Sequence, residues 1–390
     1  MKITELTPDV GQTPFTRAVL KTIRNQQRQL LLRWTCDTPQ ELEAVKRFLR
    51  HFDATIGASG TTQLDFTMPL GTLKSLYEHA GRFDDSYLID SIEELRAKHV
   101  VRWACGRKNF DVTSRPIVYA ILNVTPDSFY DGGRYDDSDA MAKQVDKMAK
   151  AGADVIEVGG QTTKPGFKEV TPEEEIKRIS PAIDLIHRRY PQMTVAVDTY
   201  KLPVMKKAIE MGVDIINDVQ AFNTPEKRKL MAESKCGLVT MHNSRDRKYS
   251  DLTREMSDFF EENLADLSAA GVDLDRVCLD EGIGYAKEPD GKQDFAMMRS
   301  IDQFNYLRRP MMIAISRKAF AKNLFGLKEE DRLPATLVAE TAMFLRGGRV
   351  IRVHDVEETV QLVKTLSAIG SGYWFGDISD EDSKIQIVKY

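Results

Sequence analysis

The sequence has few cysteines, little net charge and no long apolar run. Its four cysteines, Cys36, Cys105, Cys236 and Cys278, are isolated and lack the CxxC or zinc-ligand spacing of a metal or redox site. We expect free thiols in a reducing cytoplasm, because disulfides belong to oxidising compartments. The formal net charge of −4 provides no global basic field for nucleic acid. A phosphate-bearing ligand would therefore need a local cluster of cations.

The sequence also lacks targeting and membrane-spanning features. The first residues, MKITELTPDV, have no apolar core of signal-peptide length, and no apolar stretch reaches the roughly 20 residues of a membrane span. We therefore expect a cytoplasmic protein that does not interact with membranes. Hydrophobic residues make up 42% of the 390 positions and charged residues 29%, which is ordinary for a soluble globular protein and argues against a mostly disordered chain. This length allows one large domain and one smaller domain.

Eight β-branched runs alternate with amphipathic stretches from about residue 117 onward. The runs are 117–124, 154–160, 194–199, 214–219, 237–242, 277–282, 311–316 and 350–356. Apolar strands that alternate with helices indicate a parallel sheet covered on its faces. Eight strand–helix units in roughly 250 residues match a (β/α)8 TIM barrel, which we predict over residues 113–370. An open doubly wound sheet is the alternative, because periodicity alone does not show closure.

Residues 1–112 do not follow this rhythm, and we predict that they form a small α/β domain of unknown role. One helix in it has a clear start, because Thr38 is followed three residues later by Glu41, the pattern of a capping box. Thr171 and Glu174 repeat the pattern at a helix of the barrel. We expect residues 371–390 to be a surface tail.

Polar residues stand at the carboxyl ends of the predicted strands, which surround a single active-site face in a barrel. They include Asn123, Asp198, Asn217, Asp280, Lys318, Arg352 and His354. A single Asp at such a position is usually a helix cap, so the prediction depends on seven of the eight strands sharing this feature.

Two kinds of chemistry can be distinguished within this set. The acceptors Asp198, Asn217 and Asp280 suit a flat heterocycle with several N–H groups. The donors Lys318, Arg352 and His354 suit phosphate oxygens. Asn123 offers a hard oxygen ligand for Mg²⁺, which binds through few protein groups and the phosphates of its substrate. We therefore expect a ring-binding site with an adjacent anion site.

Seven motifs in this region resemble those of dihydropteroate synthase in order and approximate spacing. They are ILNVTPDSFYDGG, GADVIEVGGQTTKPG, VDTYK, DIINDV, LDEGIG, ISRKAF and RVHDV, and they cover about residues 115–370. That family is a transferase of folate biosynthesis. It condenses 6-hydroxymethyl-7,8-dihydropterin diphosphate with p-aminobenzoate and gives 7,8-dihydropteroate and diphosphate. The resemblance implies these two small molecules as partners, and we also expect a homodimer.

The resemblance assigns roles to individual residues. It implies that Asn123 contacts the Mg²⁺ that neutralises the diphosphate. The implied diphosphate contacts are Thr163, Arg352 and His354. The implied pterin pocket is Asp198, Asn217, Asp280 and Lys318, and catalysis would fall to Asp198, Asp280 and Lys318. Pro165 and Tyr285 would flank the p-aminobenzoate ring, and loops 124–134 and 161–168 would close over the site.

Four departures from the family pattern affect the second substrate and the loops. The usual Glu-Ser-Thr-Arg-Pro stretch begins with Gln161 and has Lys164 in place of arginine, which loses the planar fork of the guanidinium. Glu281 replaces a proline, and we expect it to add an acid near the mouth of the site. Ala319 stands where some members have a serine near the p-aminobenzoate carboxylate. Two alternatives therefore remain, a non-catalytic pterin-binding paralogue and a pterin-dependent methyltransferase-type barrel.

Overall fold

The computed structural model describes residues 1–6, 13–125, 136–161, 169–245, 247–286 and 290–374. The chain forms two compact units, one of residues 1–100 with 364–390 and the other of residues 101–363. No helix among the described residues combines the length and apolar character needed to cross a membrane.

The first unit contains a four-stranded antiparallel sheet with the order β1-β2-β4-β3. Its strands are β1 (Lys2–Glu5), β2 (Gln29–Thr35), β3 (Thr55–Ser59) and β4 (Gln63–Pro69). Its α-helices are α1 (Pro14–Asn25), α2 (Pro39–Leu49), α3 (Leu73–Ala80) and α4 (Ser86–His99), and its 3₁₀ helices are η1 (Leu70–Thr72) and η2 (Gly81–Phe83). A small α/β region before the barrel, as predicted, is confirmed.

An aromatic core holds this unit together. Trp34 lies in edge contact with Phe48 and Phe83, at centroid distances of 6.1 and 5.6 Å. Tyr373, from the end of the described chain, packs on Phe52 at 4.9 Å. Helix α2 starts with the predicted capping box, in which the Thr38 hydroxyl and the Glu41 carboxylate each accept a backbone N–H from the other end of the box.

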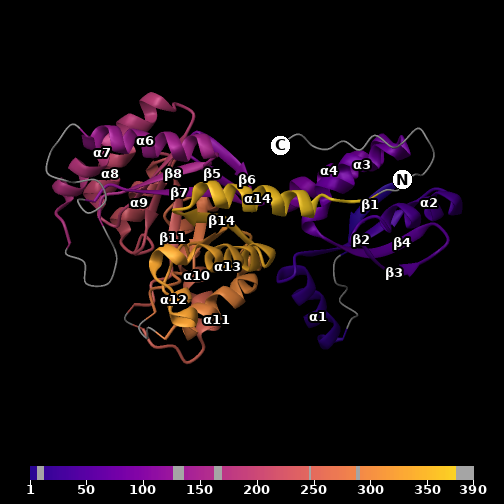
Figure 1. Cartoon of the computed structure of the whole chain (residues 1–390). Coiled ribbons are helices and arrows are strands. Elements are labelled where there is room, and N and C mark those ends of the chain that lie inside the picture. The colour runs from indigo at the N-terminus through magenta and orange to yellow at the C-terminus, as the bar shows by residue number, and fades with distance from the viewer. Residues whose placement is uncertain (7–12, 126–135, 162–168, 246, 287–289, 375–390) are drawn as a thin grey trace. The chain divides into compact units, whose positions relative to one another are not determined.

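The second unit is a closed barrel of eight parallel strands, so the predicted barrel is confirmed and the open sheet is excluded. Figure 1 shows its strands enclosed by helices. The strands are β7 (Ile117–Asn123), β8 (Val155–Gly159), β9 (Thr194–Asp198), β10 (Ile215–Asp218), β11 (Gly237–Met241), β12 (Val277–Asp280), β13 (Met311–Ile313) and β14 (Gly348–Val353). The α-helices that follow them are α6 (Asp136–Ala151), α7 (Pro172–Arg189), α8 (Leu202–Glu210), α9 (Pro225–Glu233), α10 (Leu252–Ala269), α11 (Lys292–Ser300), α12 (Phe320–Phe325), α13 (Leu333–Leu345) and α14 (Val356–Gly370). The 3₁₀ helices are η3 (Leu274–Arg276), η4 (Ile301–Leu307) and η5 (Glu329–Asp331).

Helix α7 shows how these connections are specified locally. The Thr171 hydroxyl accepts the backbone N–H of Glu174 at 3.3 Å, as predicted for the cap. The Glu174 carboxylate, however, accepts the Arg178 guanidinium at 2.8 Å, a pairing of neighbours one helical turn apart. The cap and the proline at the first position of the helix thus fix its start.

Strands β5 (Arg102–Cys105) and β6 (Lys108–Asp111) form a hairpin that packs against the barrel interior. We had predicted that residues 1–112 all belong to the small first domain. The Trp103 indole stacks on the Tyr119 ring at 6.4 Å and donates to the Arg276 carbonyl at 3.0 Å. A Cβ at Gly237 would lie 2.8 Å from the Cys105 Sγ, so only glycine allows this close approach. The amino end of the barrel is therefore filled by apolar side chains, and the polar site lies toward the other end.

Candidate functional site

Polar side chains converge inside the barrel near the carboxyl ends of its strands. Asn123 pairs in register with Gly159, Gly159 with Asp198, and Asp198 with Asn217, so these positions lie at one level across four neighbouring strands. Each of these positions is the last or the penultimate residue of its strand, which places this level at the mouth of the barrel.

Glu157 connects three of these strands below the mouth. It is 1% exposed, and its Oε2 accepts the Asn217 amide at 2.9 Å and the Tyr119 hydroxyl at 2.8 Å. Its Oε1 accepts Nε of Arg352 at 2.7 Å and also Nη2 of the same guanidinium. Arg352 Nη2 also donates to Asp198 Oδ2 at 2.9 Å. Arg352, predicted to contact an anion, is thus held between two carboxylates.

The sequence did not point to Glu157, because it lies within a strand and not at a strand end. The available signal was a single acid in the otherwise uncharged run VIEVGG, residues 155–160. A charged residue is almost never fully buried unless it has partners.

Burial and neighbouring charges set the protonation of Asp198 and Arg352. Burial, followed by the negative charge of Glu157, raises the pKa of Asp198 to about 7, although Arg352 acts against this shift. Burial disfavours the charged guanidinium, but the Glu157 and Asp198 carboxylates outweigh it and raise the pKa of Arg352 above its ordinary value. Arg352 therefore stays charged, while Asp198 titrates near neutral pH.

Asn217 presents a buried acceptor that pairs with none of the described residues. Its side chain is 3% exposed, and its Nδ2 is engaged by Glu157. Its Oδ1 is buried and has no hydrogen-bond partner among the described residues. Leaving such an atom unsatisfied costs about 1–3 kcal/mol, so the site is suited to a ligand that donates an N–H there.

Asp280 and Lys318 form a second polar pair at the ends of neighbouring strands. The Gly282 backbone N–H donates to Asp280 Oδ1 at 2.8 Å, and the Lys318 ammonium donates to the Ile283 carbonyl. Burial raises the pKa of Asp280, with Lys318 acting against the shift. Burial lowers the pKa of Lys318 to about 8, partly offset by Asp280.

Arg317 holds Lys318 in place through the backbone. Its φ of 52° lies in the left-handed region, which a non-glycine residue adopts at a cost. Its guanidinium forms a two-pronged ion pair with Asp355, at 2.8 and 2.7 Å, and donates to two carbonyls of η5. Arg317 stands between Ser316 and Lys318 in the chain, so its fixed backbone positions both neighbours. Ser316 in turn contacts His354.

His354 and Asn123 lie on the exposed side of the site. The His354 Nδ1 lies 3.0 Å from the Ser316 hydroxyl, which also accepts the His354 backbone N–H at 3.2 Å. Thr163, Pro165 and Lys164 lie outside the described residues. The described hydrogen bonds thus join Asp198, Asn217 and Arg352 through Glu157, whereas His354 and Asn123 stand apart from that network.

The expectation that Glu281 adds an acid near the mouth is wrong. Its side chain is fully buried, and neither carboxylate oxygen has a hydrogen-bond partner among the described residues. Glu281 directly follows the last residue of β12, and the charges that act on it come from Asp280 and from Asp302 of η4. Burial, followed by the charge of Asp280, raises the pKa of Glu281 well above its ordinary value.

Gln161 is bound to a buried lysine, Lys201. Lys201 is buried, and its ammonium donates to Gln161 Oε1 at 2.7 Å, to the Val170 carbonyl at 2.5 Å and to Glu175 Oε2 at 2.8 Å. The Val170 backbone N–H also donates to Gln161 Oε1, at 2.9 Å. Residues 161 and 170 are therefore bound to one ammonium.

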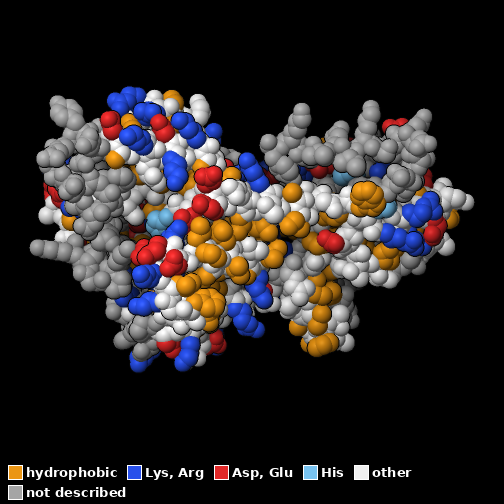
Figure 2. All heavy atoms as spheres, in the orientation of Figure 1, with side chains coloured by type: hydrophobic (Ala, Val, Ile, Leu, Met, Phe, Trp, Pro, Cys, Tyr) orange, Lys and Arg blue, Asp and Glu red, His pale blue; other side chains and the backbone are white. Residues whose placement is uncertain are grey.

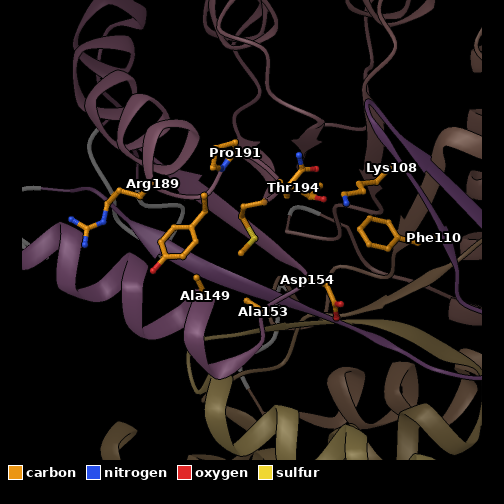
Figure 3. A pocket seen from close by; sticks show the side chains of 11 residues that line it. Lys108, Phe110, Ala149, Ala153, Asp154, Arg189, Pro191 and Thr194 are labelled. Atoms are coloured by element: carbon orange, nitrogen blue, oxygen red, sulfur yellow. The ribbon is translucent and has the colours of Figure 1, made fainter. Parts of the chain in front are cut away.

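A cavity of about 520 Å³ lies away from these residues, at the amino ends of β8 and β9 (Figure 3). Tyr190, Ala153 and Phe110 line it together with Lys108 and Arg189. The Arg189 guanidinium is paired with Asp146 at 2.6 Å, and the Tyr190 hydroxyl donates to the same carboxylate at 2.9 Å. None of the predicted site residues lines this cavity.

Comparisons with known proteins agree with this geometry. The model of the family described as pterin binding enzyme matches residues 119–354. The dihydropteroate synthase of Bacillus subtilis is 36% identical over 256 residues, which are 65% of this chain and 89% of the relative.

Two solved structures of Xanthomonas albilineans dihydropteroate synthase have the same fold. The structure with 4-aminobenzoic acid superposes with a TM-score of 0.65 at 32% identity, over 69% of this chain and 98% of the other. The complex with 7,8-dihydropteroate gives 0.62 at 30% identity, over the same shares. The chain therefore belongs to the pterin-binding enzyme family and, within it, to the dihydropteroate synthases.

Proposed function

We propose that the chain condenses 6-hydroxymethyl-7,8-dihydropterin diphosphate with p-aminobenzoate and releases 7,8-dihydropteroate and diphosphate. The observation that carries this proposal is the orphan Oδ1 of Asn217, a buried acceptor at the level of Asp198 in the barrel. The Xanthomonas albilineans relative, of the same family, was solved with 4-aminobenzoic acid and with 7,8-dihydropteroate.

The acceptor set fits the edge of a pterin. Such a ring presents an amino group and ring N–H groups, which match the oxygens of Asn217, Asp198 and Asp280. The Lys318 ammonium complements the ring's own acceptors. Because Asn217 Nδ2 is held by Glu157, the amide cannot turn its donor toward the ligand without losing a 2.9 Å hydrogen bond.

The chemistry is a displacement at carbon. The C–O bond to the diphosphate breaks and its electron pair leaves with the diphosphate. The arylamine nitrogen then forms the new C–N bond and loses a proton. The carboxylates of Asp198 and Asp280 stabilise positive charge on the pterin as the bond breaks. An arylamine is already nucleophilic, so no strong base is needed.

The residues present fit Mg²⁺ as a partner of the diphosphate. The Asn123 side chain is exposed at the end of β7, and a Cβ at Gly159 would come within 3.2 Å of its Oδ1, so glycine leaves this oxygen its room. Mg²⁺ typically binds through few protein groups and the phosphates of its substrate, so one side-chain oxygen such as that of Asn123 is a sufficient protein contribution. When bound, Mg²⁺ would offset the negative charge of the leaving group.

The remaining predicted residues receive roles from the same proposal. The diphosphate is bound by Thr163, Arg352 and His354. The positive charge of Arg352 also favours the ionised form of the Asp198 carboxylate. Pro165 and Tyr285 flank the ring of the second substrate.

Diphosphate release from the purified full chain tests the proposal. With pterin diphosphate, p-aminobenzoate and Mg²⁺, we expect stoichiometric release of diphosphate and 7,8-dihydropteroate. Release that is independent of p-aminobenzoate, or absent, would contradict it. Tight pterin binding without release would favour the non-catalytic paralogue, and methyl transfer that survives Arg352→Ala and Asn123→Ala would favour the methyltransferase-type barrel.

We also propose that the protein is a cytoplasmic homodimer. Its four free thiols are buried and unpaired, which suits a reducing compartment. Apolar side chains gather on the surface near α12 and α13 (Figure 2), where Leu324, Phe325, Val338 and Leu345 are each more than half exposed. Exposed apolar patches of this kind commonly mark protein interfaces. Sedimentation measurements on the parent and on Val338→Asp test this pairing, because a monomeric parent would contradict it.

A further inference from the structure

Three side chains meet beyond the acidic pocket, from the carboxyl-end loops of three consecutive barrel strands. Arg245 follows β11, Tyr285 follows β12 and Lys318 follows β13, and these strands are neighbours in the barrel. The guanidinium carbon of Arg245 lies 4.9 Å from the centre of the Tyr285 ring, and the Lys318 ammonium lies 5.4 Å from it. One aromatic ring is therefore in contact with two cations.

The turn that carries Tyr285 is tightly fixed. Its backbone N–H donates to the Gly282 carbonyl at 3.2 Å, and the Gly284 N–H donates to the buried Asp294 carboxylate at 2.9 Å. Gly284 has a φ of 86°, and a Cβ there would lie 2.8 Å from Lys318 Cδ. Glycine at this position thus allows the lysine stem to pass close to the turn that carries Tyr285.

The start of the Arg245 loop is also held by hydrogen bonds. Asn243 Oδ1 accepts the Arg245 backbone N–H at 3.2 Å, while its Nδ2 donates to the Val219 carbonyl at 3.3 Å. Val219 directly follows β10, so the loop is tied to the end of a fourth strand. The backbone of Arg245 is therefore positioned by hydrogen bonds that lead to the end of a barrel strand.

The two cations have different surroundings. Asp280 and Asp294 both act on Lys318 as negative charges, so its charge is shared with the acidic pocket. Arg245 comes from the opposite side of the β12 loop, and its planar group can bind a carboxylate with two N–H donors while one face lies on an aromatic ring. The cap residue of α12 is Ala319, whose own side chain has no hydrogen-bond donor.

We infer that Arg245 anchors the carboxylate of an aromatic amine whose ring lies against Tyr285. This inference rests on the proposed function and adds the residue that selects the charged end of the second substrate. Lys318 serves the pterin side, and Arg245 serves the carboxylate side.

The test compares two amines that differ in one charge. Steady-state kinetics of the full chain would be measured with p-aminobenzoate and with its neutral amide, 4-aminobenzamide. Because a hydrogen bond to a charged group is worth about 1.5–3 kcal/mol, Arg245→Ala should raise the KM for p-aminobenzoate at least about tenfold. The KM for the neutral amide and for pterin diphosphate should stay within about twofold. Arg245→Gln should give the same pattern and serves if the alanine variant folds poorly.

Arg247→Ala is the matched control, because Arg247 is an exposed arginine of the same loop. An unchanged KM for p-aminobenzoate in both Arg245 variants would overturn the inference while leaving the proposed function intact. Equal losses for both amines would also overturn it, because they would show that only ring packing was lost. A parent protein that releases no diphosphate with p-aminobenzoate would defeat the proposed function and the inference together.

Discussion

Arg352 and Glu157 form a buried ion pair inside the barrel, with 2.7 Å between Nε of the arginine and Oε1 of the glutamate. The pair joins β14 to β8, which lie on either side of β7. The same glutamate accepts the Asn217 amide and so orients that side chain. Glu157 therefore positions both the guanidinium of Arg352 and the Oδ1 acceptor of Asn217 in the proposed pterin site.

Glu157→Ala should destabilise the fold and weaken pterin binding. Among the described partners of Arg352 it leaves Asp198, and it removes the carboxylate that orients Asn217. Breaking a buried pair typically costs 3–5 kcal/mol, and we expect a loss of about that size in urea unfolding. Asp302→Ala removes an exposed ion pair with Arg346 and should cost less than about 1 kcal/mol. Equal effects of the two changes would contradict the role of Glu157.

The pH dependence of kcat/KM for the pterin diphosphate should be bell-shaped. The pKa of Asp198 is about 7 and that of Lys318 about 8, so activity rises as the carboxylate ionises and falls as the ammonium loses its proton. Asp198→Asn should remove the rising limb, and Lys318→Met the falling limb, each from a lower maximum. A rising limb that persists in Asp198→Asn would assign it to another group.

Lys201→Met should lower the free energy of unfolding by about 3–5 kcal/mol, because it leaves the Glu175 carboxylate buried without its 2.8 Å partner. Urea denaturation measures this. Lys207→Met is the control, since its ion pair with Glu210 is exposed and should contribute less than about 1 kcal/mol. If Lys201→Met lowers the free energy of unfolding no more than the control does, the Lys201 ammonium does not stabilise the fold through its bonds to Gln161, Val170 and Glu175.

Glu281→Gln should make stability less sensitive to pH. Burial raises the pKa of Glu281 above its unfolded value of about 4.3, so the folded chain holds this proton more tightly than the unfolded chain. That contribution is fully present below about pH 4.3 and is lost as the pH rises toward the folded pKa. Unfolding in urea from pH 5 to 8 should therefore show a steeper decline for the parent than for Glu281→Gln. Glu233 is exposed, so Glu233→Gln is the control and should leave the pH dependence of the free energy of unfolding unchanged. If the free energy of unfolding declines equally with pH in the parent and in Glu281→Gln, then Glu281 is already ionised in the folded protein.

Much of the barrel could be predicted from the sequence, because a parallel sheet covered by helices requires apolar runs at regular intervals. The same logic predicted Asp198, Asn217 and Asp280, since strand ends of a parallel barrel share one face. Residues 101–112 were grouped with the first domain because a two-stranded hairpin has no periodicity of its own to show where it packs.

The surroundings of Glu157, Glu281 and Arg245 could not be predicted from the sequence, because they depend on contacts between segments that are distant along the chain. Glu157 acts on Arg352 only because β14 and β8 flank β7, a relation that depends on barrel closure. Glu281 was expected at the mouth because it follows Asp280, but its side chain is fully buried, which depends on tertiary packing. Arg245 was not singled out, because its relation to Tyr285 depends on how two loops approach each other.

A calorimetric titration of 6-hydroxymethylpterin into Asn217→Ala tests the central claim, that the orphan oxygen at this level of the barrel binds the pterin edge. The matched control is Asn263→Ala, which removes a buried asparagine whose amide is already bound to Thr240 and to the Ala221 carbonyl. We predict that Asn217→Ala weakens binding by about 1–3 kcal/mol while Asn263→Ala leaves the affinity of the folded protein unchanged. Equal affinities for the parent and Asn217→Ala would contradict the claim.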